Sequence, residues 1–303
     1  MYDIFCQEEL LLLANKNHTV NDRAFAGSHS FSRLLPTKIS KFECEIELAA
    51  DLDFAIKKQE FSLAYQPIYN SLHEIIWCEV LVRWQRKKDG ELVPPEIFIP
   101  LAETNNRIHD IWVWSFETAL AQLQEWRTDS YQLPKLSFNF SPSQTDFSRN
   151  TQFSYAEQIK NWCKSYNFSS RDFLIELTET PLLKDYAAAI DLFDDLKSIG
   201  VRLCLDDFGA GFSSLSMLRF LPVSTIKIDR SFLVRLPDSV SNRAIVKATI
   251  ALASELGINV VAECVENEQQ FRFLNNLGCD YFQGYFFTKP IASNILEKLF
   301  IKN

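Results

Sequence analysis

Residues 203–211 read Leu203-Cys204-Leu205-Asp206-Asp207-Phe208-Gly209-Ala210-Gly211, and the fold and chemistry of the chain are organised around this stretch. An apolar run ends in two adjacent carboxylates, and a glycine-flanked turn follows at once. Two neighbouring acids at the end of a buried strand are hard to desolvate unless a cation or hydrogen-bond donors meet them. The stretch therefore indicates either a divalent-metal site or a strand that ends in a solvated Asp-Asp turn, where acids are common.

The chain around this stretch alternates between strand-like and helix-like segments, and several of the helices stop at a glycine suited to a left-handed cap. The predicted strands span residues 61–68, 75–84, 136–140, 173–179, 201–207, 225–229, 258–263 and 281–287. Strands that alternate with helices imply a parallel sheet, and eight such units imply closure into an α/β fold, a TIM-like (β/α)8 barrel. An open doubly wound sheet is the alternative, but no Gly-x-Gly-x-x-Gly turn opens a helix here.

Two regions complete the predicted organisation. Residues 1–41 show no clear period, and we interpret them as an N-terminal arm of unknown role with a short helix at 8–14. Residues 42–303 form the barrel, in which Pro94-Pro95 predicts a loop over residues 94–100. The predicted helices span residues 42–58, 111–126, 155–166, 186–199, 239–256, 268–277 and 293–300.

Composition narrows the class of protein. A length of 303 residues fits one large barrel as well as two average domains, and 25 Phe provide material for a large core. The net charge of -8 argues against a nucleic-acid duplex as partner, because duplex binding depends on many basic residues. The seven Cys show no Cys-x-x-Cys spacing and are typical of reduced, buried thiols. With no basic leader and no apolar run long enough to span a membrane, we expect a cytoplasmic protein.

Polar residues gather at the predicted strand ends, where barrel enzymes place their active sites. They are Glu79, Asn139, Glu176, Asp206, Asp207, Lys227, Asp229, Glu263 and Gln283. A single polar residue in a strand can be explained by a strand face that is exposed to solvent. Parallel barrel strands are buried on both faces, however, so solvent exposure does not explain polar residues on most of the strands. Carboxylate and amide oxygens without histidine favour Mg²⁺ or Mn²⁺, and the Asp206-Asp207 pair allows two ions to be bridged at a phosphodiester.

The ordered motifs resemble those of the EAL-domain phosphodiesterases, which hydrolyse cyclic di-GMP. The resemblance covers residues from about 42 to the C-terminus. The motifs that carry it are Tyr65-Gln66-Pro67-Ile68, Glu79-Val80-Leu81-Val82-Arg83, Asn139-Phe140-Ser141-Pro142, Glu176-Leu177-Thr178-Glu179, Asp206-Asp207-Phe208-Gly209-Ala210-Gly211, Lys227-Ile228-Asp229, Ala262-Glu263-Cys264-Val265-Glu266 and Gln283-Gly284-Tyr285.

The resemblance implies a role for each of these polar residues. It assigns metal ligation to Glu79, Asn139, Glu176, Asp206 and Asp207, and substrate binding to Arg83, Gln66 and Asp229. Lys227 would assist the attacking water, Glu263 and Gln283 would support metal-bound waters and the phosphate, and Glu179 would brace the loop at residues 208–215. The implied product is linear pGpG.

The resemblance also implies one reversed barrel strand and a homodimer formed through the loop after Asp207 and nearby helices. Val80, Cys264 and Asn106 depart from the usual Ala, Gly and Gly; Val80 adds bulk behind Glu79, and Cys264 is expected to crowd the turn after Glu263. Asn tolerates left-handed backbone geometry, so Asn106 in place of glycine is expected to disturb the local backbone little. The alternative function is a catalytically inactive EAL-like domain that acts as a cyclic di-GMP receptor or protein-interaction module.

Overall fold

The fold is known from a computed structural model that describes residues 38–127, 133–178, 186–209, 218 and 221–300. The strands are β1 (Phe61–Tyr69), β2 (Ile75–Gln85), β3 (Leu92–Val93), β4 (Lys135–Phe140), β5 (Phe173–Thr178), β6 (Arg202–Phe208), β7 (Thr225–Ile228), β8 (Asn259–Ala262), β9 (Tyr281–Phe282) and β10 (Ile291–Ala292). The helices are α2 (Lys38–Ala55), α3 (Pro95–Thr104), α4 (Ile108–Trp126), α5 (Pro142–Thr151), α6 (Tyr155–Tyr166), α8 (Tyr186–Ser198), α10 (Arg230–Leu233), α11 (Val240–Glu255), α12 (Glu268–Asn276) and α13 (Ser293–Phe300), with a short 3-10 turn η2 (Ser170–Asp172).

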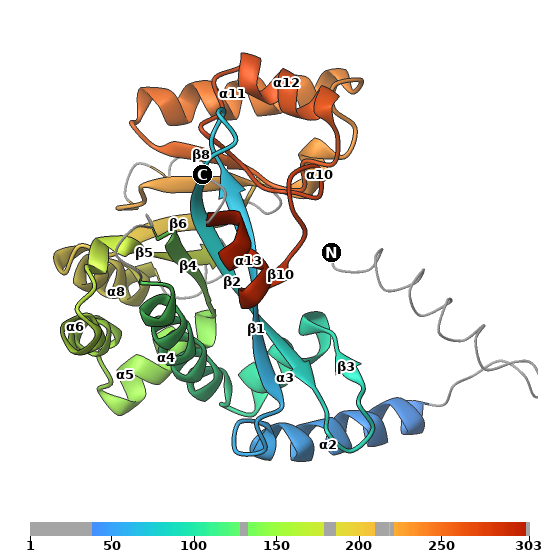
Figure 1. The fold of residues 1–303 in the computed structure, drawn as a ribbon, viewed down its shortest axis with the longest axis vertical. Helices are drawn as coiled ribbons and strands as arrows, with labels where there is room; N and C mark the ends of the chain where they lie inside the picture. The colour runs from blue at the N-terminus through green and yellow to red at the C-terminus, as the bar shows by residue number, and fades with distance from the viewer. Residues whose placement is uncertain (1–37, 128–132, 179–185, 210–217, 219–220, 301–303) are drawn as a thin grey trace, which may run out of the picture.

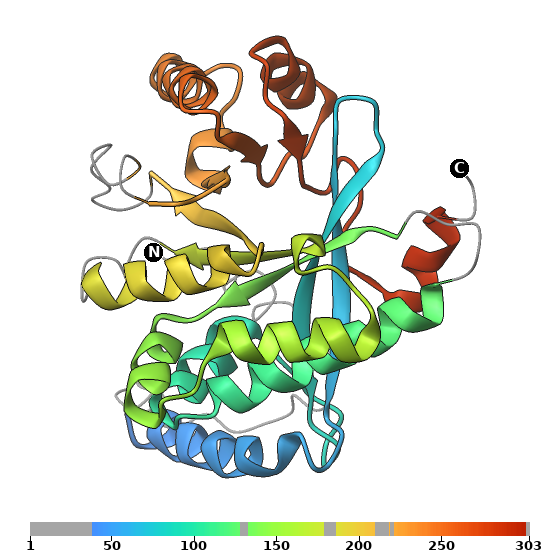
Figure 2. The same cartoon turned by 90° about the vertical axis from the view of Figure 1, so that its left-hand side faces the viewer.

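The strands close into a barrel in the order β1, β2, β4, β5, β6, β7, β8 and β9, and β9 pairs back onto β1. Neighbours from β2 to β9 are parallel, whereas β1 runs antiparallel to both β2 and β9. The helices lie outside the strands (Figures 1 and 2). The predicted TIM-like barrel with one reversed strand is therefore confirmed.

A small apolar cluster fills the barrel interior on the amino-terminal side of the strand-end acids. It comprises Ile68, Trp77, Leu174, Cys204 and Val261, all nearly inaccessible to solvent. The last four each precede by two residues an acid from the sequence prediction, and residues two apart on a strand face the same side. The cluster is therefore the floor of the barrel interior, and the acids lie in the layer above it.

A second lobe extends from the far ends of β1 and β2, where α2, α3 and β3 lie together (Figure 1). Its core includes Leu52 from α2, Trp84 from β2 and Phe98 from α3. The long β1–β2 hairpin, paired from Phe61 with Trp84 to Tyr69 with Ile75, connects this lobe to the barrel.

Three local predictions were wrong. Residues 94–100 are not a loop, because α3 begins at Pro95, and proline is compatible with the first helical position. Residues 142–151, for which no element was predicted, form α5, which starts with a capping box between Ser141 and Gln144. The last barrel strand ends at Phe282, because the backbone turns at Gly284, whose carbonyl accepts hydrogen bonds from the N–H groups of Phe287 and Thr288.

Other boundaries moved by a few residues: α2 begins at Lys38 rather than residue 42, and α4 begins at Ile108 rather than 111. The predicted helix at 8–14 lies outside the described residues. Within the described part of the chain, no helix has both the length and the apolar character to cross a membrane.

Candidate active site

The barrel register brings the predicted acids together from strands that are distant in sequence. Glu79 on β2 pairs with Ser137, two residues before Asn139 on β4, and Asn139 pairs with Glu176 on β5. Thr178 on β5 then pairs with Asp206 on β6. The parallel register therefore places these side chains at the carboxyl-terminal end of the barrel, above the apolar floor.

Lys227 on β7 lies at the centre of four carboxylates. Its Nζ is 2.5 Å from Glu263 Oε1, 2.8 Å from Glu176 Oε2, 3.3 Å from Glu79 Oε2 and 3.5 Å from Asp206 Oδ1. We call these four residues the acid cluster. The Lys227 side chain is only 1% exposed, so this ammonium can be held in the barrel only by opposite charges and hydrogen bonds.

Burial and charge together set the ionisation of this site. Burial raises the pKa of Glu176 to about 8, although Lys227 opposes the shift, and burial also raises the pKa values of Asp206 and Glu263. Burial by itself would lower the pKa of Lys227, but the acid cluster raises it well above its usual value. Burial thus favours the protonated, neutral forms of Glu176, Asp206 and Glu263, and a further cation in the site would favour their ionised forms.

Glu79 differs from the other acids because its carboxylate accepts hydrogen bonds from two side-chain amides. Asn139 Nδ2 donates to Glu79 Oε1 at 2.7 Å, and Gln283 Nε2 donates to Glu79 Oε2 at 2.7 Å. Burial would raise the pKa of Glu79, but Lys227 and these amides lower it below its usual value. This carboxylate is therefore fixed in orientation and in charge.

A backbone irregularity explains how Asp206 and Asp207 serve one site. On a regular strand their side chains would face opposite sides, but the β6–β7 register shifts between Leu205 and Phe208. Asp207 has φ +52°, and its N–H donates to Asp206 Oδ1 at 2.9 Å. As a result, oxygens of Asp206, Asp207 and Glu263 lie within 4.8 Å of one another.

These residues fit a pair of hard divalent cations. The donors are carboxylate and amide oxygens, which Mg²⁺ and Mn²⁺ prefer. Two buried oxygens, Glu176 Oε1 and Gln283 Oε1, have no hydrogen-bond partner among the described residues. Buried acceptors without partners are costly, and a coordinated ion or its water would satisfy them.

Backbone hydrogen bonds join the loops after β8 and β9 next to the site. Val265 N–H donates to the Gln283 carbonyl at 3.0 Å, and Phe286 N–H donates to the Val265 carbonyl at 3.0 Å. A Cβ atom on Gly284 would lie 2.2 Å from the Val265 oxygen, so only glycine allows this approach. The sequence motif Gln283-Gly284-Tyr285 contains this glycine but predicts no role for it; the sequence signal for its role is its position directly after a polar residue at a strand end.

The three departures from the family pattern are accommodated. Val80 is 4% exposed and packs in the apolar layer on the opposite side of β2 from Glu79, so it does not crowd the carboxylate. Asn106 has φ +55°, the left-handed geometry that Asn tolerates. Cys264 has φ +50°, so the turn after Glu263 takes the left-handed shape despite the side chain.

The predicted substrate-binding residues lie at different distances from the acid cluster. Gln66 on β1 pairs directly with Glu79, and its Nε2 is 3.5 Å from the Thr288 carbonyl. Arg83 is four residues beyond Glu79 on the same face of β2, and its Nη1 donates to the Val82 carbonyl at 3.0 Å. Asp229 instead caps α10, accepting from Ser231 N–H at 3.0 Å.

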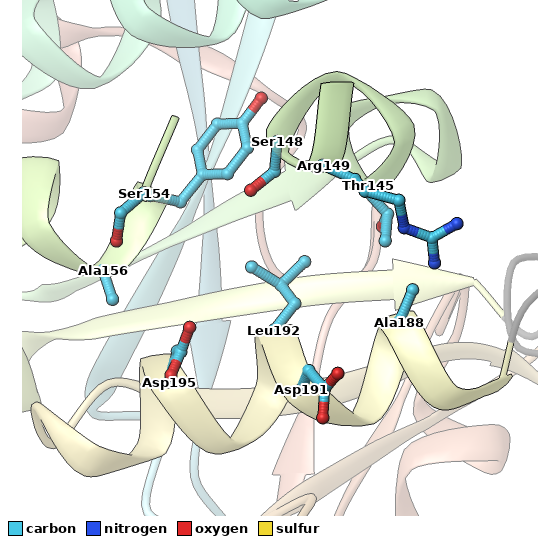
Figure 3. A pocket seen from close by; sticks show the side chains of 10 residues that line it. Thr145, Ser148, Arg149, Ser154, Ala156, Ala188, Asp191, Leu192 and Asp195 are labelled. Carbon is cyan, nitrogen blue, oxygen red and sulfur yellow. The ribbon is translucent and has the colours of Figure 1, made fainter. Parts of the chain in front are cut away.

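Glu179 lies outside the described residues, and of the predicted loop 208–215 only Phe208 and Gly209 are described. The roles assigned to that residue and that loop remain predictions. A cleft of about 190 Å³ elsewhere on the molecule lies between α5, the start of α6 and α8, lined by Thr145, Arg149, Asp191 and others (Figure 3). None of the predicted site residues that the structure describes lines it, so its presence says nothing about the chemistry of the acid cluster.

The chain is similar to known proteins in sequence and in fold. The sequence model of the family described as EAL domain matches residues 49–290. The chain is 34% identical over 268 residues to the oxygen sensor protein DosP of Escherichia coli, covering 88% of this chain and 33% of DosP. It is 31% identical to the cyclic di-GMP phosphodiesterase NbdA of Pseudomonas aeruginosa, covering 97% of this chain and 36% of NbdA. The chain thus spans about a third of the length of these curated relatives.

Solved structures share the fold. The PaMucR phosphodiesterase in complex with c-di-GMP has a TM-score of 0.75 and 32% identity, covering 82% of this chain and 99% of that chain. The EAL enzyme Bd1971, in its cAMP and cyclic-di-GMP bound form, has a TM-score of 0.77 and 30% identity, covering 86% of this chain and 70% of that chain.

Proposed function

The chain belongs to the EAL domain family, and from this membership we propose that it hydrolyses one phosphodiester bond of cyclic di-GMP to give linear pGpG. The observation that carries the proposal is the acid cluster around Lys227, to which Asn139 and Gln283 are joined through Glu79. Two relatives are named as phosphodiesterases, NbdA for cyclic di-GMP and PaMucR in complex with c-di-GMP, and the same substrate is proposed for this chain.

The residues fall into two groups that would hold two Mg²⁺ or Mn²⁺ ions. Glu79, Asn139, Glu176 and Asp206 would hold the first ion, and Asp207 with Asp206 would hold the second. When bound, such ions supply Lewis acidity toward the phosphate and lower the pKa of a coordinated water. Two observations support this division: Glu176 Oε1 has no hydrogen-bond partner in the part of the chain that the structure describes, and Asp206, Asp207 and Glu263 lie close together.

The side chains of this protein would orient the remaining participants. Lys227, buried at the centre, would hold the attacking water in line with the phosphorus, and its cation would offset the negative charge that develops there. Glu263 and Gln283, which follow the neighbouring strands β8 and β9, would hold waters and phosphate oxygens beside Lys227, and the Val265–Gln283 backbone hydrogen bond would fix their loops. Arg83 and Gln66 would contact the rest of the nucleotide from β2 and β1, and Asp229 would do so from the start of α10.

The direct test is turnover. We expect purified protein to convert cyclic di-GMP to pGpG with Mg²⁺ or Mn²⁺ and to stop when EDTA is added. The absence of pGpG under either ion at neutral or mildly alkaline pH would overturn the proposed activity. Nucleotide binding that persists in EDTA without turnover would instead identify the receptor or interaction module named as the alternative.

We also propose a homodimer in which α11 takes part. Its outward face carries Val240, Ala244, Ile245 and Ala248, all exposed, and Val240 is 71% exposed. An apolar helix face at this spacing is suited to packing against a second copy across a two-fold axis. We expect light scattering to show a dimer that Ile245→Glu dissociates; a monomer at all concentrations would contradict the proposal.

We also propose that the reaction takes place in the reducing cytoplasm. The free thiols of Cys78, Cys163, Cys204, Cys264 and Cys279 support this proposal.

A further inference from the structure

The short helix α10 is connected both to the turn that follows Asp206 and Asp207 and to the loop that begins with Glu263. It begins directly after Asp229, which caps it and which follows Lys227 by two residues. A helix of one turn leaves its carbonyl groups without the partners that a longer helix would provide. Donors from two other helices supply them: Asn242 Nδ2 of α11 donates to the Ser231 and Phe232 carbonyls at 3.2 and 3.0 Å.

The second donor is Gln270 of α12, which is 1% exposed and uses both ends of its amide. Its Nε2 donates to the Leu233 carbonyl at 2.9 Å, and its Oε1 accepts from Glu266 N–H at 2.7 Å. Glu266 follows Glu263 by three residues. Gln270 therefore joins α10 directly to the loop that carries Glu263.

On its other side α10 contacts the turn after the aspartate pair. Gly209 follows Asp207 by two residues and has φ +92°. A Cβ atom on Gly209 would lie 2.9 Å from Cε2 and 3.2 Å from Cζ of Phe232, so the aromatic ring lies directly against this glycine. Phe232 thus limits where the backbone after Asp206 and Asp207 can lie.

These contacts converge on one cluster, because Asp206, Asp207 and Glu263 are the three acids whose oxygens lie within 4.8 Å of one another. We propose that α10 is a brace that sets the distance between the Asp206-Asp207 turn and the Glu263 loop, with Phe232 and Gln270 as positioning residues for metal binding. Neither residue touches the reacting atoms. Metal ligands must be held to within about 0.5 Å of their working geometry, which requires supporting contacts of this kind.

The test measures Mn²⁺ binding to the full chain without nucleotide, by titration with electron paramagnetic resonance detection of free Mn²⁺. We expect Phe232→Leu and Gln270→Met each to raise the Kd for Mn²⁺ by about tenfold, as loss of supporting contacts around a metal site does. Phe232→Leu keeps an apolar side chain and removes the flat ring, so it is the variant expected to fold if Gln270→Met does not. In turnover, which rests on the proposed function, kcat should fall while KM for cyclic di-GMP changes little.

Two control variants separate positioning from loss of stability. Val234→Ala alters an exposed residue at the end of α10, and Leu52→Ala weakens the buried core of the α2 lobe. Both should bind Mn²⁺ as the unaltered protein does. The brace would be overturned if Phe232→Leu and Gln270→Met had Kd values for Mn²⁺ within about twofold of that of the unaltered protein. It would also be overturned if Leu52→Ala raised the Kd for Mn²⁺ as much as these two variants do. If Mn²⁺ binds as expected but no nucleotide is hydrolysed, the proposed function fails and the brace stands.

Discussion

Replacing Lys227 by methionine would remove the ammonium group at the centre of the acid cluster. Methionine has a similar length and flexibility, so it fills the space of the lysine chain without its ammonium. Glu176 and Glu263, at 2.8 and 2.5 Å from Nζ, would lose their shortest ion pairs. We therefore expect Lys227→Met to be markedly less stable than the unaltered protein in EDTA.

The magnitude follows from burial. Removing one partner of a buried ion pair costs about 3–5 kcal/mol, because the remaining charge has no compensation. Lys227 is 1% exposed and lies within 3.5 Å of all four acids, so the value should lie within that range. A divalent cation would replace the missing charge, and an ion at a hundred times its Kd adds about 2.7 kcal/mol to the stability of the protein that binds it.

Urea unfolding monitored by the fluorescence of the six Trp residues measures both effects. We expect a large fall in the urea midpoint of Lys227→Met in EDTA, and a larger gain on addition of Mn²⁺ than the unaltered protein shows. Lys197→Met, at an exposed position on α8, is the matched control and should change neither value. A free energy of unfolding within about 1 kcal/mol of the unaltered protein in EDTA would refute the reasoning.

Three further predictions concern single residues. Glu79→Ala removes the carboxylate to which the Asn139 and Gln283 amides donate, so pGpG formation should become undetectable; near-normal rates would contradict the site assignment. Gly284→Ala would place a Cβ atom 2.2 Å from the Val265 oxygen. Overpacking and weakened hydrogen bonds should together lower the free energy of unfolding in urea by about 2–4 kcal/mol. An unchanged urea midpoint would show that the loops after β8 and β9 can separate. Burial lowers the pKa of His109 below its ordinary value of 6.5, so the contribution of this residue to the free energy of unfolding is complete above pH 6.5 and falls as the pH drops toward the lower native pKa. In His109→Gln we expect the free energy of unfolding to depend less on pH between neutral and acidic conditions. An unchanged pH dependence in this variant would show that other groups cause it.

Local signals predicted most of the barrel. Strands such as 173–178 and 202–208 lie within one residue of their predicted bounds, because buried parallel strands have apolar runs on both faces. The signals failed where one residue type is compatible with two structures. Pro94-Pro95 predicts a loop, although Pro95 starts α3, and the strand predicted over residues 281–287 includes Gly284, which lies beyond the end of β9.

The candidate site was predicted as a set of residue types rather than as an arrangement. Acids and amides at strand ends indicated hard-metal chemistry, and the structure brings Glu79, Asn139, Glu176, Asp206 and Glu263 together at one end of the barrel with Lys227. The sequence places Asp229 in the same group, as the last residue of the strand predicted over residues 225–229, whereas β7 ends at Ile228. Its carboxylate caps α10, a role that depends on the residues after it.

The alternation of strands and helices and the chemistry available at the strand ends can be predicted from local sequence, since they depend on which residues avoid water within a few positions of one another. Three features of the site depend instead on the folded chain: the Lys227 ammonium lies among four acids, a shift in register at Asp206-Asp207 brings both toward Glu263, and Phe232 lies against Gly209. Those distances join residues up to 148 positions apart, as for Lys227 and Glu79. They follow from barrel closure and strand register, which are set by the packing of the whole chain and by no local pattern.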